Sequence, residues 1–251
     1  MSNGTVNFQI KNGIGTLSFE HPAANSLPLA LLNTLAEKLQ ELDHRADVKT
    51  IVLTTSGTGA FCAGASLKEL KSITSLNDAE SFFLGFATLL NAIRKLQKMV
   101  IARVHGKIVG GGVGLVSCCD YAIATTAASI KLSELSIGLG PYVIEPAVSR
   151  KIGANAFAQL ALDCHAWKSA EWGLHKGLYN YMVKSEKELD SLVAETALRF
   201  ASYGAEAIKT LRQLLWKDTA HWEELLVKNA KITARLALGN ASQKILKSLS
   251  I

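Results

Sequence analysis

The first twenty residues alternate polar and apolar positions around an Asn-Gly pair. In 5-TVNFQIKNGIGTLSFE-20 the alternation has the period of a half-buried strand. Asn12-Gly13 lies at its centre, and a two-residue hairpin turn favours this pair because both of its positions adopt positive φ. The pattern therefore predicts two antiparallel strands at the start of the chain.

The pattern that follows alternates between helix and strand. After Pro28, which suits the first turn of a helix, leucines recur at helical spacing, at positions 32, 35, 39 and 42. Further periodic segments predict a helix over residues 77–98 and strands over residues 49–55, 99–104 and 120–125. Strands that alternate with helices along the chain predict an α/β fold.

The last quarter of the chain has a different pattern. From about residue 186 onward the periodicity is purely helical, with many leucines and alanines. No internal repeat or low-complexity linker separates this part from the rest. We therefore divide the chain into a core of residues 1–185 and a C-terminal helical region of residues 186–251.

Composition indicates a protein with a large core and no membrane segment. The chain has 251 residues, 49% of them hydrophobic, and no run of about 18 uncharged apolar residues. The N-terminus lacks the basic and apolar order of a signal peptide. The four cysteines show no CxxC spacing, so reduced and buried thiols are expected. These features predict a soluble, cytoplasmic protein with no membrane partner.

The net charge of +6 favours an anionic partner. Because the lysines and arginines are scattered along the chain, an anionic small molecule is a better expectation than a nucleic acid.

Two glycine-bearing turns carry the candidate chemistry. In 56-SGTGAFCAGASLKEL-70, Ser66 and Glu69 form an S-x-x-E capping box, which predicts a helix start near Ser66 and leaves the N–H of Ala65 pointing outward. In 105-HGKIVGGGVGLVSCCDYAIAT-125, a glycine triplet leads from a strand into a second helix. If the two turns converge, their N–H groups form an oxyanion hole in which each donor is worth roughly 3 to 4 kcal/mol.

Glycine runs also occur for reasons unrelated to an oxyanion hole. Tight packing of a helix on a strand can require them, although two matched turns weaken that interpretation. Nucleotide binding is disfavoured, because neither G-x-G-x-x-G nor G-x-x-x-x-G-K-[ST] occurs.

The two turns resemble those of the crotonase superfamily, the enoyl-CoA hydratases and isomerases. The segment 61-FCAGASL-67 is similar to the F-x-A-G-A-D-[LI] turn of that family, with Ser66 in place of the Asp. The segment 105-HGKIVGGG-112 is similar to its N-G-x-x-x-G-G-G turn, and the resemblance extends over nearly the whole chain. It implies an α/β fold of the crotonase type, a β-β-α superhelix followed by C-terminal helices that form a homotrimer or homohexamer.

The resemblance also implies the substrate and several site residues. An acyl-CoA thioester is the expected partner, and no cofactor is expected beyond the coenzyme A of the substrate. Ala65 and Gly111 would donate their N–H groups to the thioester oxygen. Coenzyme A would be bound at Ala23, Ala63, Ala65 and Leu67.

Hydratases of this family carry two glutamates, at positions that here read Gly114 and Glu134. Glu134 lies in an apolar segment, so its pKa is expected to rise toward neutrality, which suits a group that both takes and gives a proton. Glu145 is a second candidate carboxylate, although it precedes Pro146 at a predicted helix start, where an acidic residue is favoured by the helix dipole alone.

One glutamate suffices to move a double bond, so isomerisation is slightly favoured over hydration. A glutamate restored at position 114 is expected to raise hydration. Hydration of a short or branched 2-enoyl-CoA, decarboxylation, thioester hydrolysis and a non-catalytic acyl-CoA-binding or RNA-binding role stay open. The histidines show no metal-binding spacing and no G-x-S-x-G occurs, so no metal site and no serine hydrolase are expected.

Overall fold

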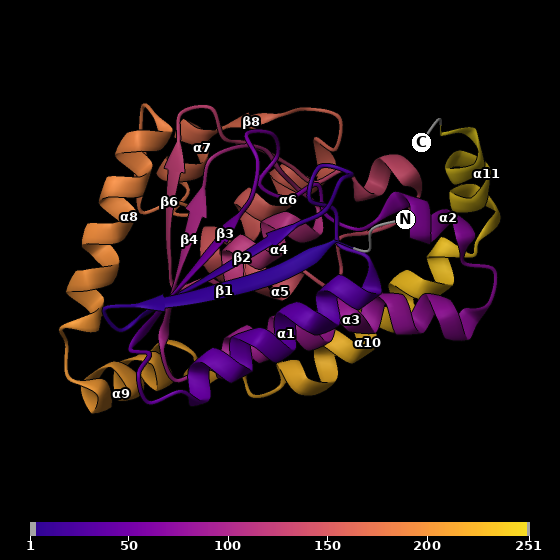
Figure 1. The fold of residues 1–251 in the computed structure, drawn as a ribbon. Coiled ribbons are helices and arrows are strands. Elements are labelled where there is room, and N and C mark those ends of the chain that lie inside the picture. The colour runs from indigo at the N-terminus through magenta and orange to yellow at the C-terminus, as the bar shows by residue number, and fades with distance from the viewer. Residues whose placement is uncertain (1–3, 250–251) are drawn as a thin grey trace.

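A computed structural model of the chain describes residues 4–249 and contains a main sheet of six strands (Figure 1). The strands lie in the order β1 (Thr5–Lys11), β2 (Ile14–Glu20), β3 (Thr50–Thr55), β4 (Met99–Val104), β6 (Tyr121–Thr125) and β9 (Tyr181–Val183). All neighbours are parallel except β1 and β2. This arrangement confirms the α/β fold predicted from the alternating pattern.

The opening hairpin is confirmed in detail. Asn12 and Gly13 have φ values of 53° and 77°, and Lys11 pairs with Ile14 across the turn. Positive φ at both positions is the geometry that lets a two-residue turn follow the twist of its strands.

A second, three-stranded sheet has the order β5 (Ile108–Val109), β7 (Ser129–Lys131) and β8 (Lys168–Ser169). These strands and β9 were not predicted, because two or three residues are too few to display an alternating pattern.

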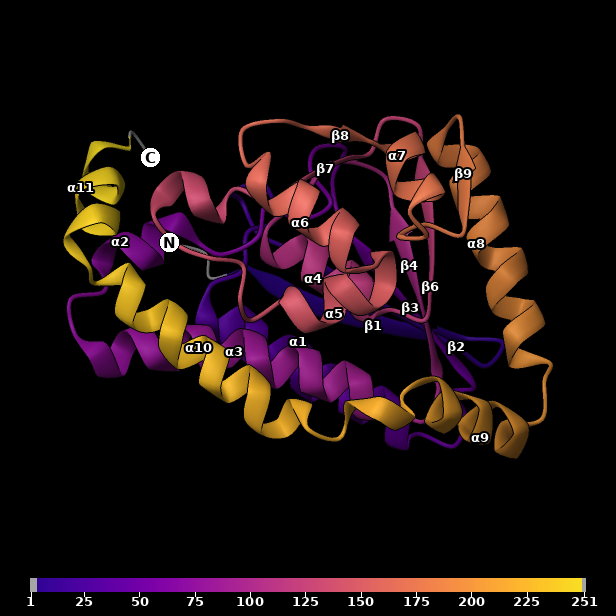
Figure 2. The same cartoon turned by 180° about the vertical axis from the view of Figure 1, so that it is seen from behind.

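Helices cover the main sheet and extend beyond it (Figures 1 and 2). They are α1 (Leu29–His44), α2 (Leu67–Ser72), α3 (Leu76–Lys95), α4 (Gly111–Cys118), α5 (Glu145–Ile152), α6 (Ala154–Leu162), α7 (Ala170–His175), α8 (Glu186–Ala201), α9 (Ala205–Leu215), α10 (Trp222–Ala237) and α11 (Asn240–Ser248), with 3-10 turns η1 (Glu134–Ile137) and η2 (Lys217–Thr219). Among the helices of residues 4–249, none is long and apolar enough to cross a membrane.

The main sheet is covered on both faces. On one face, Leu189 and Val193 of α8 pack in a small core with side chains of β3, β4 and β6. The other face contributes to the large core, which α1, α3 and α4 complete. Strands buried on both faces explain the near-continuous apolar runs of β3 and β4.

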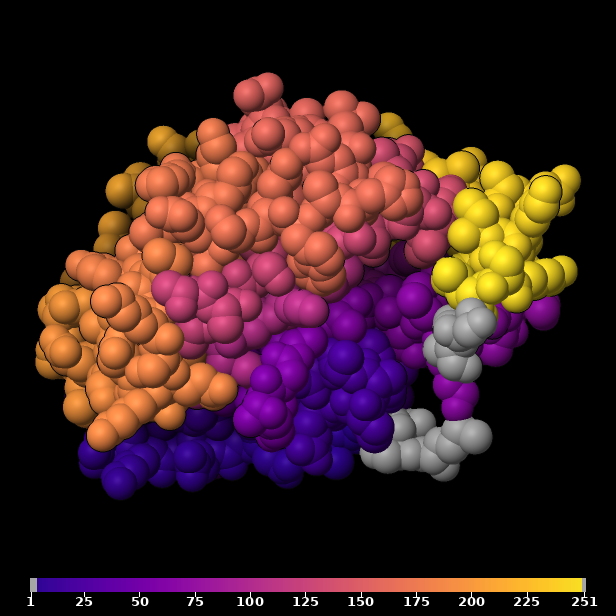
Figure 3. Space-filling view, turned by 90° about the horizontal axis from the view of Figure 1, so that it is seen from above, coloured from indigo at the N-terminus to yellow at the C-terminus, as the bar shows by residue number. Residues whose placement is uncertain are grey.

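The C-terminal helices return to the start of the chain. Helix α10 runs along α3, and α11 packs against α2 and η1. Seen from above in the space-filling view, the surface has a hollow between α11, which is yellow, and the body of the molecule (Figure 3). The violet segment of α2 lies beside this hollow. Every described element after residue 185 is helical, although α8 packs on the sheet, so the division into two domains stays a prediction.

A buried ion pair ties this C-terminal region to the core. Arg212 of α9 contacts Asp120 with Nε 2.9 Å from Oδ2, and the same carboxylate accepts hydrogen bonds from the N–H of Val100 and from Nε1 of Trp216. The guanidinium also donates to the Ile93 carbonyl in the last turn of α3. Buried charges are stable only when paired and hydrogen-bonded in this way.

Candidate functional site

The first glycine-bearing turn is held by Leu27, which forms a short bridge with Ala65. The N–H of Leu27 donates to the Gly64 carbonyl at 2.7 Å, and that of Ser66 donates to the Leu27 carbonyl at 3.2 Å. Helix α2 starts at the next residue, as the capping pattern predicts.

Only half of the predicted capping box forms. The hydroxyl of Ser66 accepts a hydrogen bond from the N–H of Glu69 at 3.3 Å. The carboxylate of Glu69 does not return to Ser66, because it accepts a hydrogen bond from the N–H of Leu29 at 2.9 Å. Tertiary contact with the start of α1 therefore replaces the local partner that the sequence pattern predicts.

The second turn lies directly against the first. Cys62 pairs with β5, through hydrogen bonds from its N–H to the Lys107 carbonyl and from the N–H of Val109 to its own carbonyl. A β-carbon built on Gly64 would lie 2.6 Å from the Val109 carbonyl oxygen and 3.1 Å from the N of Gly111. The predicted convergence of the two turns is confirmed, and Gly64 makes the close approach possible.

Ala65 and Gly111 lie at one cavity, and their N–H groups have no acceptor within the described part of the chain. The N–H of Gly111 is one of the free donors at the start of α4, where the helix dipole is positive. Two such free donors are the components of an oxyanion hole.

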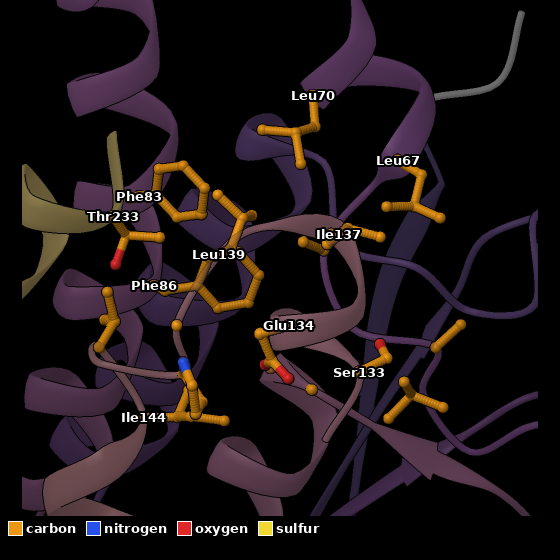
Figure 4. Close-up of a pocket in the computed structure, with 18 residues that line it drawn as sticks. Leu67, Leu70, Phe83, Phe86, Ser133, Glu134, Ile137, Leu139, Ile144 and Thr233 are labelled. Atoms are coloured by element: carbon orange, nitrogen blue, oxygen red, sulfur yellow. The ribbon is translucent and has the colours of Figure 1, made fainter. Parts of the chain in front are cut away.

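The cavity between these turns has a volume of about 290 Å³ and an almost wholly apolar wall (Figure 4). The segments 75–95 and 135–145 both contribute residues to it. Its lining includes Ala63, Leu67, Leu70, Phe83, Phe86, Ser133, Glu134, Ile137, Leu139, Ile144 and Thr233. An apolar cavity with few polar groups is typical of a small-molecule site.

Glu134 carries the only carboxylate among the described residues that line the cavity, and it begins the 3-10 turn η1. The residue is half-buried, but its Oε2 is shielded from solvent and has no hydrogen-bond partner among the described residues. Burial raises the pKa of Glu134 to about 7, against the opposing effect of nearby backbone N–H groups. The direction agrees with the expectation from its apolar neighbours, and a carboxyl group with this pKa can take and give a proton near neutral pH.

The second carboxylate position is filled by a hydrocarbon side chain. Gly114 lies in α4, and a β-carbon built there would be 2.4 Å from Cγ2 of Ile144. A glutamate therefore cannot be added at position 114 while Ile144 keeps its place, which corrects the expectation that this single change would raise hydration.

Glu145 does not reach the cavity. It is the first residue of α5, and its Oε1 accepts a hydrogen bond from the hydroxyl of Ser149 at 2.7 Å. It is absent from the residues that line the cavity. The interpretation of this residue as a helix-start carboxylate agrees with the structure.

The residues expected to bind coenzyme A separate into two groups. Ala63, Ala65 and Leu67 line the cavity, whereas Ala23 is exposed and does not. Ala23 nevertheless lies near the first turn, because the N–H of Ala63 donates to the carbonyl of the adjacent Ala24.

Thr233 is a lining residue that no pattern in the sequence marked. It comes from α10, whereas Phe83 and Phe86 come from the buried face of α3.

The four cysteines are free and buried, as predicted. Burial raises the pKa of Cys62 to about 12, so this thiol next to the first turn is not a nucleophile near neutral pH. Within residues 4–249, no three His, Cys, Asp or Glu side chains form a group that could hold a metal ion.

Comparison with known proteins assigns the family. The family model "Enoyl-CoA hydratase/isomerase" matches residues 9–244. A probable enoyl-CoA hydratase of Bacillus subtilis is 26% identical over 86% of this chain and 83% of its own length. An ethylmalonyl-CoA decarboxylase of Gallus gallus is 27% identical over 94% of this chain and 79% of its own length.

Solved structures share the fold. The enoyl-CoA hydratase of Bacillus halodurans superposes with a TM-score of 0.90 at 21% identity, over 97% of this chain and 99% of that one. That of Mycobacterium smegmatis has a TM-score of 0.81 at 29% identity, over 95% and 93% of the two chains. The crotonase-type fold is thereby confirmed, and this chain belongs to the enoyl-CoA hydratase/isomerase family of enzymes, which act on acyl-CoA.

Proposed function

We propose that this enzyme moves the double bond of an enoyl-CoA from position 3 to position 2, with Glu134 as its acid and base. The observation that carries the proposal is the convergence of one carboxyl group and two free N–H donors on a single apolar cavity. No other lining residue has an ionisable side chain among those the structure describes.

The oxyanion hole is formed by the backbone of Ala65 and Gly111. When a base removes a proton from the α carbon, negative charge develops on the thioester oxygen, and two fixed N–H donors stabilise it. Their rigidity supports this role, since Ala65 is paired with Leu27 and Gly111 begins a helix.

Glu134 carries the proton between two carbons. Its carboxylate takes the α proton, the electron pair delocalises into the thioester, and the same carboxyl group returns the proton to the γ carbon. Its pKa of about 7 supports both directions of transfer near neutral pH. The reaction needs no cofactor beyond the coenzyme A carried by the substrate.

Hydration of a 2-enoyl-CoA is the second candidate, favoured by the name of the Bacillus subtilis relative. It ranks lower because water must be activated and held as well, and the second carboxylate position is occupied by Ile144. Decarboxylation, the activity named for the Gallus gallus relative, ranks lower too. The free carboxylate of such a substrate would enter a cavity whose described lining contains Glu134 and no cationic side chain.

Replacement of Glu134 tests the proposal. Glu134→Gln preserves shape and removes the proton carrier, so isomerisation of a 3-enoyl-CoA should fall by about 10²-fold or more. Glu145→Gln is the matched control, because that carboxylate contacts Ser149 outside the cavity, and its turnover should stay within about twofold of wild type.

Unchanged turnover in a folded Glu134→Gln protein would contradict the role of Glu134. Absence of turnover in the wild type across short, branched and long enoyl-CoAs, with RNA retained in a filter-binding assay, would favour the non-catalytic alternative.

A homotrimer or homohexamer of this chain in the cytoplasm is part of the proposal. Leu211, Leu214 and Leu215 of α9 are 45%, 59% and 48% exposed, which supports contact with a second copy. Light scattering should give a particle mass three or six times that of the chain, and Leu214→Glu should lower this particle mass. A monomeric wild type would contradict the assembly alone.

A further inference from the structure

One wall of the cavity contains Ile144, which packs on a residue far from it in the sequence, Gly114. Ile144 lines the cavity and is only 4% exposed, while Gly114 is buried in α4. The space that a side chain at position 114 would need is occupied, since a β-carbon there would lie 2.4 Å from Cγ2 and 2.7 Å from Cβ of Ile144. Ile144 and Glu134 are both labelled among the lining side chains in the close-up (Figure 4).

The segment that carries Ile144 is held on both sides. Nδ2 of Asn229 in α10 donates to the Tyr142 carbonyl at 2.8 Å, and the N–H of Glu145 donates to the Pro141 carbonyl at 2.9 Å. The Ile144 carbonyl accepts the first hydrogen bond of α5, from the N–H of Val148 at 3.0 Å. The side chain is therefore a fixed part of the wall.

The hydrocarbon side chain of Ile144 offers no hydrogen-bond partner for a water molecule, and Gly114 has no side chain to offer one. A water molecule buried in a protein typically makes hydrogen bonds to about three polar partners. The polar side chains of the described lining are those of Ser133, Glu134 and Thr233, and the Thr233 hydroxyl already donates to the Asn229 carbonyl at 2.9 Å. On the Gly114 side, the N–H of Gly114 bonds to the Gly110 carbonyl within the turn.

We infer that Ile144, packed on Gly114, is the specificity-determining residue that keeps an attacking water out of the site. The inference rests on the proposed function. In isomerisation, the α C–H bond breaks, its proton passes to Glu134, and the same proton forms the new C–H bond at the γ carbon while the double bond shifts. Hydration instead forms a C–O bond from water to the β carbon and a C–H bond at the α carbon, and it requires a water held against this wall.

Two substitutions at Ile144 test the inference in the full-length protein. Ile144→Thr keeps the branched β-carbon and replaces the ethyl group by a hydroxyl, and Ile144→Ala opens space for water. The ratio of 2-enoyl-CoA hydration to 3-enoyl-CoA isomerisation should rise about tenfold or more in both variants, with ¹⁸O from labelled water in the product. Gly114→Glu combined with Ile144→Gly should raise it further, because the smaller residue makes room for the carboxylate.

Val143→Ala is the matched control. Val143 is the adjacent buried residue and also lines the cavity, but it is not among the nearest contacts at Gly114. Val143→Ala can change the rates of hydration and isomerisation, whereas the ratio of these two rates should stay within about twofold of wild type. A ratio that responds equally to Val143→Ala and Ile144→Thr overturns the inference.

The outcomes separate this inference from the function on which it rests. A wild type that isomerises, with Ile144 variants whose ratio is unchanged, overturns the role of Ile144 and leaves the proposed function standing. A wild type that hydrates as fast as it isomerises also overturns that role. A wild type that converts neither substrate overturns both. Thermal unfolding of every variant identifies those that fold, and Ile144→Thr decides the question if Ile144→Ala does not fold.

Discussion

Oε1 of Glu134 lies against Gly110, at 2.8 Å from the position that a β-carbon on residue 110 would take. Gly110 also has φ of +51°, so it combines a backbone conformation that favours glycine with the close approach of the carboxyl group. The first glycine of the triplet therefore provides the space in which Glu134 is placed.

Gly110→Ala should displace the carboxyl group and lower turnover by about 10²-fold, the range associated with loss of a positioned acid or base. Gly153→Ala is the matched control, since Gly153 has φ of +84° and no atom within 4 Å of its built β-carbon. Both variants should lose stability by roughly 1–3 kcal/mol, because the backbone at both positions has a positive φ that residues other than glycine rarely adopt. Equal turnover in the two variants would disprove the link between Gly110 and Glu134.

The rate should follow the ionisation of Glu134. Because the carboxylate form takes the α proton, kcat/KM for isomerisation should rise with pH and level off above a pKa of about 7. The measurement is a pH–rate profile of the wild type beside that of Glu145→Gln, whose profile should coincide with it. An inflection near 4.5, the ordinary value, would show that burial does not tune this group.

Stability should respond to the same ionisation. The folded-state pKa of Glu134 is raised from 4.5 to about 7, so the folded protein holds a proton that the unfolded chain releases between these values. The stabilisation that this proton contributes to the folded state is complete below about pH 4.5 and is lost as the pH rises through 7. Between about pH 5 and pH 8, the free energy of unfolding of wild type should fall relative to Glu134→Gln, on the order of 1–3 kcal/mol. Denaturant unfolding of both proteins at several pH values measures this change. A difference in unfolding free energy between wild type and Glu134→Gln that stays constant with pH would argue against the raised pKa.

The buried pair of Asp120 and Arg212 should matter more than a surface pair. Asp120→Ala leaves the Arg212 charge buried without its partner and should lower the free energy of unfolding by about 3–5 kcal/mol. Glu41→Ala, which removes the exposed pair with Lys38, should change it by less than about 1 kcal/mol. Comparable losses of unfolding free energy in the two variants, measured by chemical denaturation, would refute this ranking.

Local patterns were sufficient for the elements whose causes are local. The Asn12-Gly13 turn, the helix start at Ser66 and the periodicity of α1 and α3 each depend on residues that are neighbours in the chain. The free N–H groups of Ala65 and Gly111 and the apolar surroundings of Glu134 could be predicted for the same reason, since turns and flanking residues place them.

Tertiary structure decided the contacts between distant segments. The carboxylate of Glu69 caps Leu29 of α1, and Thr233 reaches the cavity from α10. Ile144 occupies the space beside Gly114, a pairing that no periodicity encodes. Hydrophobic patterns specify which face of an element is buried, whereas the side chain that meets it depends on how the elements pack. The sequence by itself therefore determined the family, the turns and the carboxylate, and packing decided what stands opposite that carboxylate.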